Sequence, residues 1–218
     1  MTITIYGGTL SPYVRKAVVF AIEKGVEFEL VQAFGPMGPP EFKAASPFGK
    51  IPAMTHGDFS LADSTAIITY LDAIKPEPNL IPTEARARAK TIWYEEFGDT
   101  IVGACGGKIF FNRFVAPRLL GREGDLAAAD DAQQVEFPKI ADYLESVVPA
   151  AGYLVEDRFT LADIAVASPF ATLGHAACSL NPTTHPKAFG YIESILARPS
   201  FAALLEKERE FIAPREPA

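Results

Sequence analysis

Two proline dipeptides constrain this chain more than any other feature of its sequence. Ser11-Pro12 follows a short strand-like segment and opens a segment with helical spacing, which is typical of a helix N-terminus. Ile51-Pro52 stands in front of another short strand-like segment. A proline there is either an ordinary strand start or a cis residue, and the cis form would leave the Ile51 amide and carbonyl free to pair with an extended peptide. The pair predicts a small domain in which a helix N-terminus lies near an open backbone edge.

The first eighty residues alternate between strand and helix patterns. Strands are predicted at Thr2–Tyr6, Phe28–Gln32, Ala53–His56 and Phe59–Leu61, helices at Pro12–Lys24 and Ser64–Lys75, and a proline- and glycine-rich loop at Gly35–Pro40. Gly57-Asp58 is typical of a tight hairpin between the last two strands. Pro76 and Pro78 end the second helix and begin a linker to about Glu84. The order βαβ then ββα predicts a small mixed sheet with helices.

Everything after the linker has the spacing of helices. They are predicted at Arg86–Phe97, Gln134–Val148, Leu161–Ala177, Pro186–Arg198 and Ser200–Ile212, with Gly103, Gly106 and Gly107 marking a kink or a packing contact and Pro138 a bend or a late start. The Leu161–Ala177 segment is apolar nearly all round and therefore predicts a central, buried helix, which Thr160 and Asp163 begin with a capping box. We expect a mixed α/β domain at 1–80 and an all-helical domain at 85–218.

Charge and composition exclude several classes of function. The 218 residues carry a net charge of −7 and no run of lysine or arginine, which argues against a nucleic-acid partner. We expect no signal peptide and no membrane span, because Met1–Tyr6 has no basic segment followed by an apolar core and Ile164–Ala177 is too short to cross a bilayer. Cys105 and Cys178 lie far apart and form no CxxC, which predicts free thiols and a cytoplasmic location.

Two roles are open for Ser11. It can cap the helix that begins at Pro12, as serine commonly does. It can also donate a hydrogen bond to a thiolate held at the same helix terminus, where the partial positive charge stabilises an anion. A cysteine at this position would instead be a nucleophile for disulfide exchange, so serine argues against that chemistry. Asp63-Ser64 opens the next helix and either caps it or holds both charges of an amino-acid head group.

Four segments of the chain together resemble one family. SPYVRK at 11–16, PFGKIP at 47–52 and LADSTAI at 61–67 resemble the glutathione-binding half of cytosolic glutathione transferases. FTLADI at 159–164 resembles the capped helix of their C-terminal domain. Each segment alone is weak, but their order and spacing extend over nearly the whole chain. The pattern is most similar to the serine-type classes, such as phi, theta and delta, and to many bacterial members.

The resemblance implies a thioredoxin-like N-terminal domain, an all-helical C-terminal domain and a homodimer that binds glutathione and no metal. It makes Ser11 the residue that stabilises the glutathione thiolate, with Ile51 and Pro52 at the cysteinyl part and Asp63 and Ser64 at the γ-glutamyl end. Lys50 matches a position that contacts the glycyl carboxylate.

Two positions concern the classes within this family. Phi-type members often carry a basic residue near Met37–Pro40, and this chain has none there, so the glycyl end is held either more weakly or by Lys50 alone. Tyr6 lies near the place where tyrosine-type classes keep their catalytic hydroxyl. It extends the alternating strand pattern, and we therefore expect it to serve packing.

The resemblance implies conjugation of the glutathione thiolate to a small hydrophobic electrophile, with detoxification as its role. We expect an apolar electrophile pocket, for which the candidates are Leu10, Phe34, Phe110, Phe111 and Phe114, with Arg113 and Arg118 at the rim. Phenylalanines at helical spacing are equally typical of a core. The alternatives are a non-catalytic binding protein of the same fold and a glutathione-dependent peroxidase or isomerase. A disulfide or dehydroascorbate reductase would normally need a cysteine at position 11.

Overall fold

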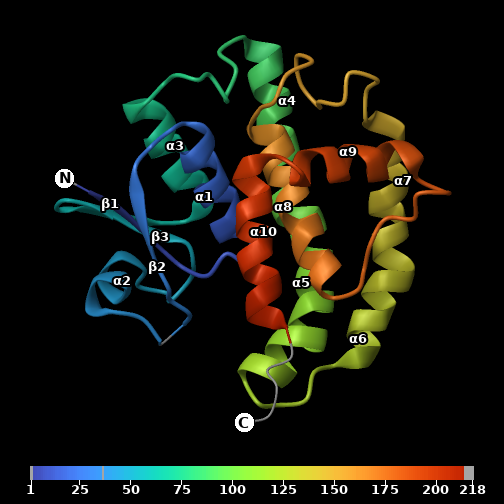
Figure 1. Cartoon of the computed structure of the whole chain (residues 1–218), viewed down its shortest axis with the longest axis horizontal. Coiled ribbons are helices and arrows are strands. Elements are labelled where there is room, and N and C mark those ends of the chain that lie inside the picture. The colour runs from blue at the N-terminus through green and yellow to red at the C-terminus, as the bar shows by residue number, and fades with distance from the viewer. Residues whose placement is uncertain (1, 36, 214–218) are drawn as a thin grey trace.

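A computed structural model describes residues 2–35 and 37–213 of the chain. Its first part is a four-stranded mixed sheet with helices, and every element after the sheet is helical (Figure 1). This confirms the predicted thioredoxin-like α/β part followed by an all-helical part. Pro36, within the predicted loop, and the last five residues of the predicted helical domain lie outside the described residues. The domain limits at 1–80 and 85–218 stay a prediction.

The sheet has the order β2-β1-β3-β4. Its strands are β1 (Ile3–Tyr6), β2 (Phe28–Val31), β3 (Ala53–His56) and β4 (Phe59–Ala62). β1 pairs with β2 in parallel and with β3 antiparallel, so that Ile3 lies opposite both Phe28 and His56. β3 and β4 form the predicted hairpin, in which Gly57 takes a φ of 65° that glycine adopts readily.

The alternation within β1 divides the hydrophobic core between the two faces of the sheet. Ile3 and Ile5 are buried on the face covered by α1 (Pro12–Glu23) and α3 (Ser64–Ile74). Tyr6 packs on the other face against Phe42, with ring centroids 6.2 Å apart, and is only 5% exposed. Its expected packing role is confirmed.

Phe42 belongs to a helix that the sequence pattern did not predict, α2 (Pro40–Ala45). The helix has six residues, and its N-cap is a proline that makes no side-chain cap bond. A segment this short shows too little of the helical period to be recognised from spacing alone. It nevertheless covers the second face of the sheet, because Phe42 and Ala45 are buried against Tyr6 and Ala53.

The helical part begins with a long, nearly continuous path. It comprises α4 (Ala85–Glu96), the π-helical segment η1 (Phe97–Val102), α5 (Gly103–Phe110) and the π-helical segment η2 (Phe111–Leu119). The sequence left open whether these glycines mark a kink or a packing contact, and the structure confirms a packing contact at Gly103 and Gly106. A Cβ on Gly103 would lie 2.8 Å from the Tyr13 hydroxyl, and one on Gly106 would lie 3.3 Å from Leu173. Gly107 meets no atom within 4 Å at the same position.

The remaining helices close the bundle around one central helix. They are α6 (Leu126–Asp131), the π-helical segment η3 (Ala132–Glu136), α7 (Phe137–Val147), α8 (Leu161–His175), α9 (Pro186–Leu196) and α10 (Pro199–Ile212). Pro138 stands in the first turn of α7, but α6 and η3 lead into α7 without a break, so the helical path begins at Leu126 and not late at Pro138. α6 was not predicted. Leu161 through Leu173 are all buried, and the capping box of Thr160 and Asp163 is present, as expected of the central helix.

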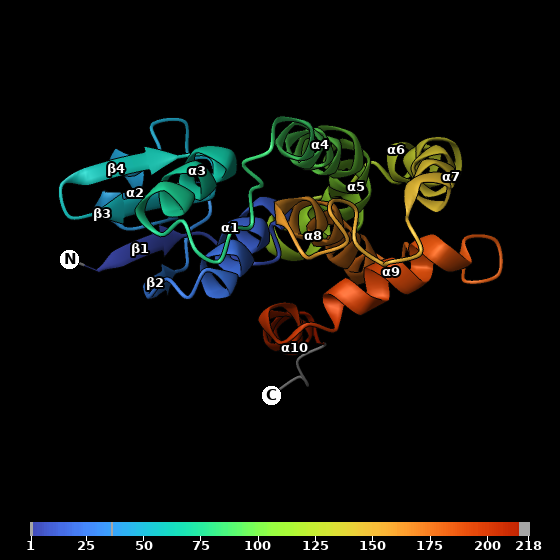
Figure 2. The same ribbon diagram turned by 90° about the horizontal axis from the view of Figure 1, so that it is seen from above.

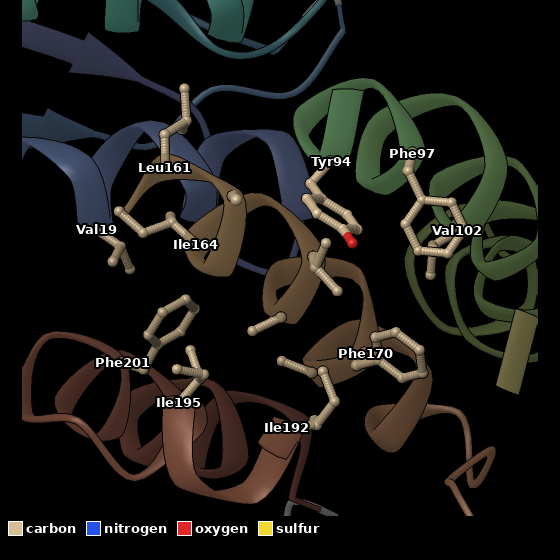
Figure 3. Packing of buried hydrophobic residues seen from close by; sticks show 14 of the residues in the cluster. Val19, Tyr94, Phe97, Val102, Leu161, Ile164, Phe170, Ile192, Ile195 and Phe201 are labelled. Carbon is tan, nitrogen blue, oxygen red and sulfur yellow. The ribbon is translucent and has the colours of Figure 1, made fainter. Parts of the chain in front are cut away.

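Seen from above, α1 lies between the sheet and α8 (Figure 2). The side chains that join the layers come from distant parts of the chain: Val19 of α1, Ile164 of α8 and Phe201 of α10 point toward one another in Figure 3. One contiguous hydrophobic core therefore runs from the sheet into the helices. None of the described helices is long and apolar enough to span a membrane.

Candidate functional site

A cleft of about 1710 Å³ opens between the sheet and the helices. The sheet side contributes the loop before α1, the turn before β3 and the start of α3. The helical side contributes residues of η1, α5, η2 and α10. All six residues predicted for thiol and peptide binding line it: Ser11, Lys50, Ile51, Pro52, Asp63 and Ser64.

Ser11 stands at the N-terminus of α1 with its side chain uncommitted. Its backbone is extended, at φ −71° and ψ 125°, and its hydroxyl makes no cap hydrogen bond. Pro12 follows in the first turn and supplies no amide, which leaves fewer free donors than an ordinary helix start has. The half-buried hydroxyl therefore lines the cleft without a partner among the described residues. Of its two possible roles, the structure does not show side-chain capping.

The Ile51–Pro52 peptide bond is cis. The Pro52 carbonyl accepts a hydrogen bond from the Asp63 amide at 3.2 Å, which joins this turn to the start of α3. On the other side of Ile51, the Lys50 carbonyl accepts a hydrogen bond from the Ser46 hydroxyl at 2.7 Å. No hydrogen bond reaches the Ile51 amide or carbonyl from the described part of the chain. Both groups of Ile51 are thus open to an extended ligand, as a free strand edge would be.

Asp63 holds the start of α3 in an unusual backbone conformation. Its φ is +90°, a region that residues other than glycine seldom occupy and that is often found at functional sites. One carboxylate oxygen, Oδ1, accepts hydrogen bonds from the amides of Thr65 at 2.9 Å and Ala66 at 3.1 Å. The second oxygen, Oδ2, makes no hydrogen bond to the described residues. Ser64 beside it is buried and also lines the cleft.

A buried charge cluster lies behind this part of the cleft. The Lys16 ammonium contacts Glu95 at 2.9 Å and Asp99 at 2.5 Å, and Thr65 donates to Glu95 at 2.7 Å. Burial raises the pKa of the Asp99 carboxyl above its ordinary value, although Lys16 acts in the opposite direction. Burial and the nearby Asp99 also raise the pKa of Tyr13, whose hydroxyl donates to the Asp99 carbonyl at 3.1 Å. The cluster fastens α1 and α3 to the helical part.

Apolar residues of the helical side and of two sheet-side loops form a second wall of the cleft, its apolar side. Of the seven residues predicted for the electrophile pocket, Leu10, Phe34, Phe110 and Phe111 line the cleft. Phe34 and Phe111 are each 37% exposed, which is unusual for a phenylalanine. Val115, Leu119 and Phe211 continue the same surface.

The structure places the other three predicted pocket residues away from the lining. Phe114 is buried, and its ring stacks on that of Phe110 with centroids 5.0 Å apart. Arg113 turns toward α6 and η3, where it pairs with Asp130 at 2.7 Å and also contacts Gln133. Arg118 donates to the Ile212 carbonyl at 3.0 Å and lies over the Phe114 ring. Both guanidinium groups thus have partners that were not recognisable from local sequence.

Three further cleft residues were not among the predicted site residues: Phe48, Asp99 and Lys207. Phe48 lies inside the PFGKIP segment, but only the structure shows that its side chain is 90% exposed. Asp99 of η1 and Lys207 of α10 reach the cleft through the packing of distant segments, which no spacing rule encodes.

The two cysteines stand apart from this chemistry. Cys105 and Cys178 are free and buried, as predicted, and neither lines the cleft. Burial raises the pKa of both thiols to about 11. They therefore remain protonated near neutral pH and are poor nucleophiles.

Comparison with known families agrees with this geometry. A family model described as "Glutathione S-transferase, N-terminal domain" matches residues 5–79, and one described as "Glutathione S-transferase, C-terminal domain" matches residues 121–208. The first contains Ser11, Ile51 and Asp63, and the second contains the capping box of α8.

Individual relatives match over almost their full length. Glutathione S-transferase 3 of Zea mays is 32% identical over 203 residues, which cover 90% of each chain. The crystal structure of a glutathione S-transferase from Rhodospirillum rubrum F11 superposes with a TM-score of 0.87 at 25% identity and covers 100% of this chain and 96% of that one. Glutathione transferase F7 from Populus trichocarpa superposes with a TM-score of 0.81 at 28% identity and covers 94% and 98%. Sequence, fold and site therefore agree that the chain belongs to the glutathione S-transferase family.

Proposed function

We propose that this glutathione transferase stabilises the thiolate of glutathione with the Ser11 hydroxyl and directs it at a small hydrophobic electrophile. The observation that carries this assignment is the uncommitted hydroxyl of Ser11, which lines the cleft at the N-terminus of α1 and caps nothing. A hydroxyl in that place can donate to a sulfur anion, and the helix terminus adds partial positive charge. Both effects lower the pKa of the bound thiol.

The rest of the tripeptide follows the polar side of the cleft. The Ile51 amide and carbonyl pair with the cysteinyl backbone, next to Pro52, in the manner of an added strand. The second Asp63 oxygen accepts from the γ-glutamyl ammonium, and the amide and hydroxyl of Ser64 donate to the γ-glutamyl carboxylate. Lys50, exposed at the end of the preceding turn, pairs with the glycyl carboxylate.

The apolar side of the cleft holds the electrophile. Leu10, Phe34, Phe110 and Phe111 supply surface that a small hydrophobic molecule covers on binding. In the reaction the sulfur lone pair forms a bond to the electrophilic carbon, and a leaving group such as a halide departs with the electrons of its own bond. The protein contributes a prepared nucleophile and its proximity to the second substrate. No step requires a metal ion.

The same assignment extends to the setting in which the enzyme acts. We propose a homodimer in the cytoplasm with a role in detoxification. Phe48 supports a self-interface, because a phenylalanine that is 90% exposed leaves apolar surface in water. Sedimentation equilibrium of the wild type and Phe48→Ser tests the dimer: a wild-type mass near that of one chain would contradict it.

Ser11→Ala tests the catalytic assignment. We expect kcat/KM for a chlorodinitrobenzene-type electrophile to fall by about 100-fold, in line with the removal of one donor to a developing or stabilised anion. The thermal midpoint should stay within about 1 °C, because the hydroxyl makes no hydrogen bond that folding would lose. Ser146→Ala is the matched control, since its hydroxyl donates to the Tyr143 carbonyl on an exposed part of α7 that does not line the cleft.

Retention on immobilised glutathione separates binding from turnover. The wild type and Ser11→Ala should both be retained, because the peptide contacts remain. Retention of the wild type without turnover of any aryl halide, epoxide or unsaturated carbonyl would identify a binding protein instead. Unchanged turnover in Ser11→Ala would remove Ser11 from the mechanism.

A further inference from the structure

The loop that carries Ser11 is tied to the central helix through the backbone carbonyl of Leu10. Leu10 immediately precedes Ser11, and its carbonyl accepts a hydrogen bond from the Thr172 hydroxyl of α8 at 3.1 Å. The loop also has an internal bond, from the Ser11 amide to the Gly8 carbonyl at 3.0 Å. Thr172 lies 162 residues away in sequence and is 3% exposed. The peptide unit between Leu10 and Ser11 is thereby held by α8.

Arg15 fixes the direction in which Thr172 donates. Its Nη1 donates to the Thr172 hydroxyl oxygen at 2.9 Å and to the Ser168 carbonyl at 2.6 Å. A threonine inside a helix often donates back to the carbonyl four residues earlier, which here is that of Ser168. Arg15 occupies that carbonyl, and it also occupies one acceptor site of the Thr172 hydroxyl. The single hydroxyl proton therefore goes to Leu10.

Arg15 is itself held by a buried carboxylate. Its Nε and Nη2 donate to the two oxygens of Glu208 at 3.1 and 2.6 Å, and His175 contacts the same carboxylate at 2.7 Å. Arg15 is completely buried and the Glu208 side chain is 2% exposed. A two-pronged guanidinium–carboxylate pair of this kind fixes orientation as well as distance. The chain of contacts thus runs from α10 through α1 and α8 to the loop of Ser11.

We propose that Thr172 and Arg15 are positioning residues for the transfer reaction, which hold the Leu10–Ser11 peptide so that the Ser11 hydroxyl points at the glutathione sulfur. Neither side chain needs to touch the substrate, since both act through the Leu10 carbonyl. A displacement of about 1 Å at a reacting group can cost about 100-fold in rate, so one hydrogen bond that sets the loop has measurable consequences. This role rests on the thiolate site proposed above.

Thr172→Val removes the hydroxyl at nearly constant volume, and Thr172→Ser restores it. We expect Thr172→Val to lower kcat/KM by about tenfold, the effect of one net hydrogen bond of ~1.4 kcal/mol, and to raise the pKa of the bound thiol. The pKa is read from the ultraviolet absorbance of the thiolate as the glutathione complex is titrated. The Kd of glutathione should stay within about twofold, and Thr172→Ser should match the wild type in all three quantities.

Thr91→Val is the matched control for the loss of a buried threonine hydroxyl. Thr91 is fully buried in α4 and donates to the Ala87 carbonyl within the same helix, away from the cleft. The Thr91→Val variant should be destabilised to the same degree as Thr172→Val, and its bound thiol should keep the pKa that it has in the wild type. An unchanged thiol pKa in Thr172→Val, or an equal shift in Thr91→Val, would overturn the positioning role. Thr172→Ala, which leaves a smaller side chain, serves the same titration if the valine variant does not fold.

A double-mutant cycle with Ser11→Ala keeps the two hypotheses apart. If Thr172 acts through Ser11, Thr172→Val should change the thiol pKa little once Ser11 is alanine. If Ser11→Ala alone leaves the thiol pKa unchanged, the thiolate site itself is wrong. If Ser11→Ala shifts the pKa and Thr172→Val does not, the thiolate site stands and only the positioning role fails.

Discussion

The two sides of the cleft are built on different principles. The sheet side presents the backbone of Ile51, the start of α3 at Asp63 and the start of α1 at Ser11, all of them places where a regular element begins or breaks. The helical side presents aromatic side chains from the middle of a helical path, such as the partly exposed Phe111 and the largely buried Phe110. In the proposed assignment, the first side holds a peptide by hydrogen bonds, and the second offers apolar surface without direction.

The difference explains why one side suits a constant substrate and the other a variable one. A backbone edge and a helix start have fixed geometry, because moving them would disturb the sheet or the helix that they belong to. A phenylalanine wall can change its shape by substitution at single positions while the helices behind it stay in place. The following substitutions test whether the two sides are separable in this way.

Glu208→Gln should have the largest effect, because Glu208 fastens the two sides together. Burial would raise the pKa of the Glu208 carboxyl, but Arg15 and His175 outweigh it, and its pKa lies below the ordinary value of 4.5. Replacing it leaves the buried Arg15 without a counter-charge, which typically costs about 3–5 kcal/mol. We expect a loss of this size in the free energy of unfolding at pH 7, measured by urea denaturation.

The pH dependence checks the origin of that loss. A carboxyl whose pKa is lowered by folding contributes stability above its unfolded pKa and loses it as the pH falls through the lower folded value. The difference between the wild type and Glu208→Gln should therefore be full at pH 6–7 and shrink only below about pH 4.5. A difference that stays constant as the pH falls well below 4.5 would show that packing, not charge, is what the substitution removes.

Phe114→Ala should come next, with a loss of about 3–4 kcal/mol in the free energy of unfolding. Its ring is 5% exposed and stacks on Phe110, so the truncation leaves a cavity directly behind the apolar side of the cleft. We also expect a higher KM for the electrophile, because Phe110 loses its support, and no change in the Kd of glutathione. Thermal denaturation, steady-state kinetics and calorimetric titration measure the three quantities in turn, and weaker glutathione binding would mean that the sides are not separable.

Substitutions of Asp63 test the sheet side, because this carboxylate caps α3 and is also proposed to bind glutathione. Asp63→Ala should lower the free energy of unfolding by about 1 kcal/mol through loss of the cap, and it should also weaken glutathione binding about tenfold or more. Asp63→Asn keeps a capping oxygen and tolerates a positive φ, so its stability should stay close to that of the wild type while binding still weakens. Equal binding by the asparagine variant and the wild type would show that the negative charge is not used.

The sequence predicts the sheet side of the site better than the helical side, for a physical reason. Ser11-Pro12, Ile51-Pro52 and Asp63-Ser64 are local patterns, because chain reversals and helix starts are set by the few residues that make them. The strands and most helices follow from spacing in the same way. Periodicity cannot tell Phe111 in the cleft from Phe114 in the core, since the two stand three residues apart on one helical path.

The contacts that spacing leaves open are those between distant segments. Arg113 and Arg118 looked like rim charges, and their partners Asp130 and Ile212 lie 17 and 94 residues away. Arg15 carries no sign in the sequence of being completely buried, because its counter-charge, Glu208, lies 193 residues later. The short helix α2 was missed for a local reason instead, because its six residues are too few to show a helical period.

Phe111→Ala should have the smallest effect on stability and the most selective effect on catalysis. Its ring is 37% exposed and lines the cleft, so its removal should cost well under the loss at Phe114, on the order of 1 kcal/mol or less. The KM for a hydrophobic electrophile should rise about three- to fivefold, because part of the apolar contact is lost, while the KM for glutathione stays unchanged. Steady-state kinetics with each substrate varied in turn measure both constants. A change confined to glutathione would reverse the roles of the two sides, whereas the expected result would show that one phenylalanine can alter electrophile binding without moving the thiolate that attacks it.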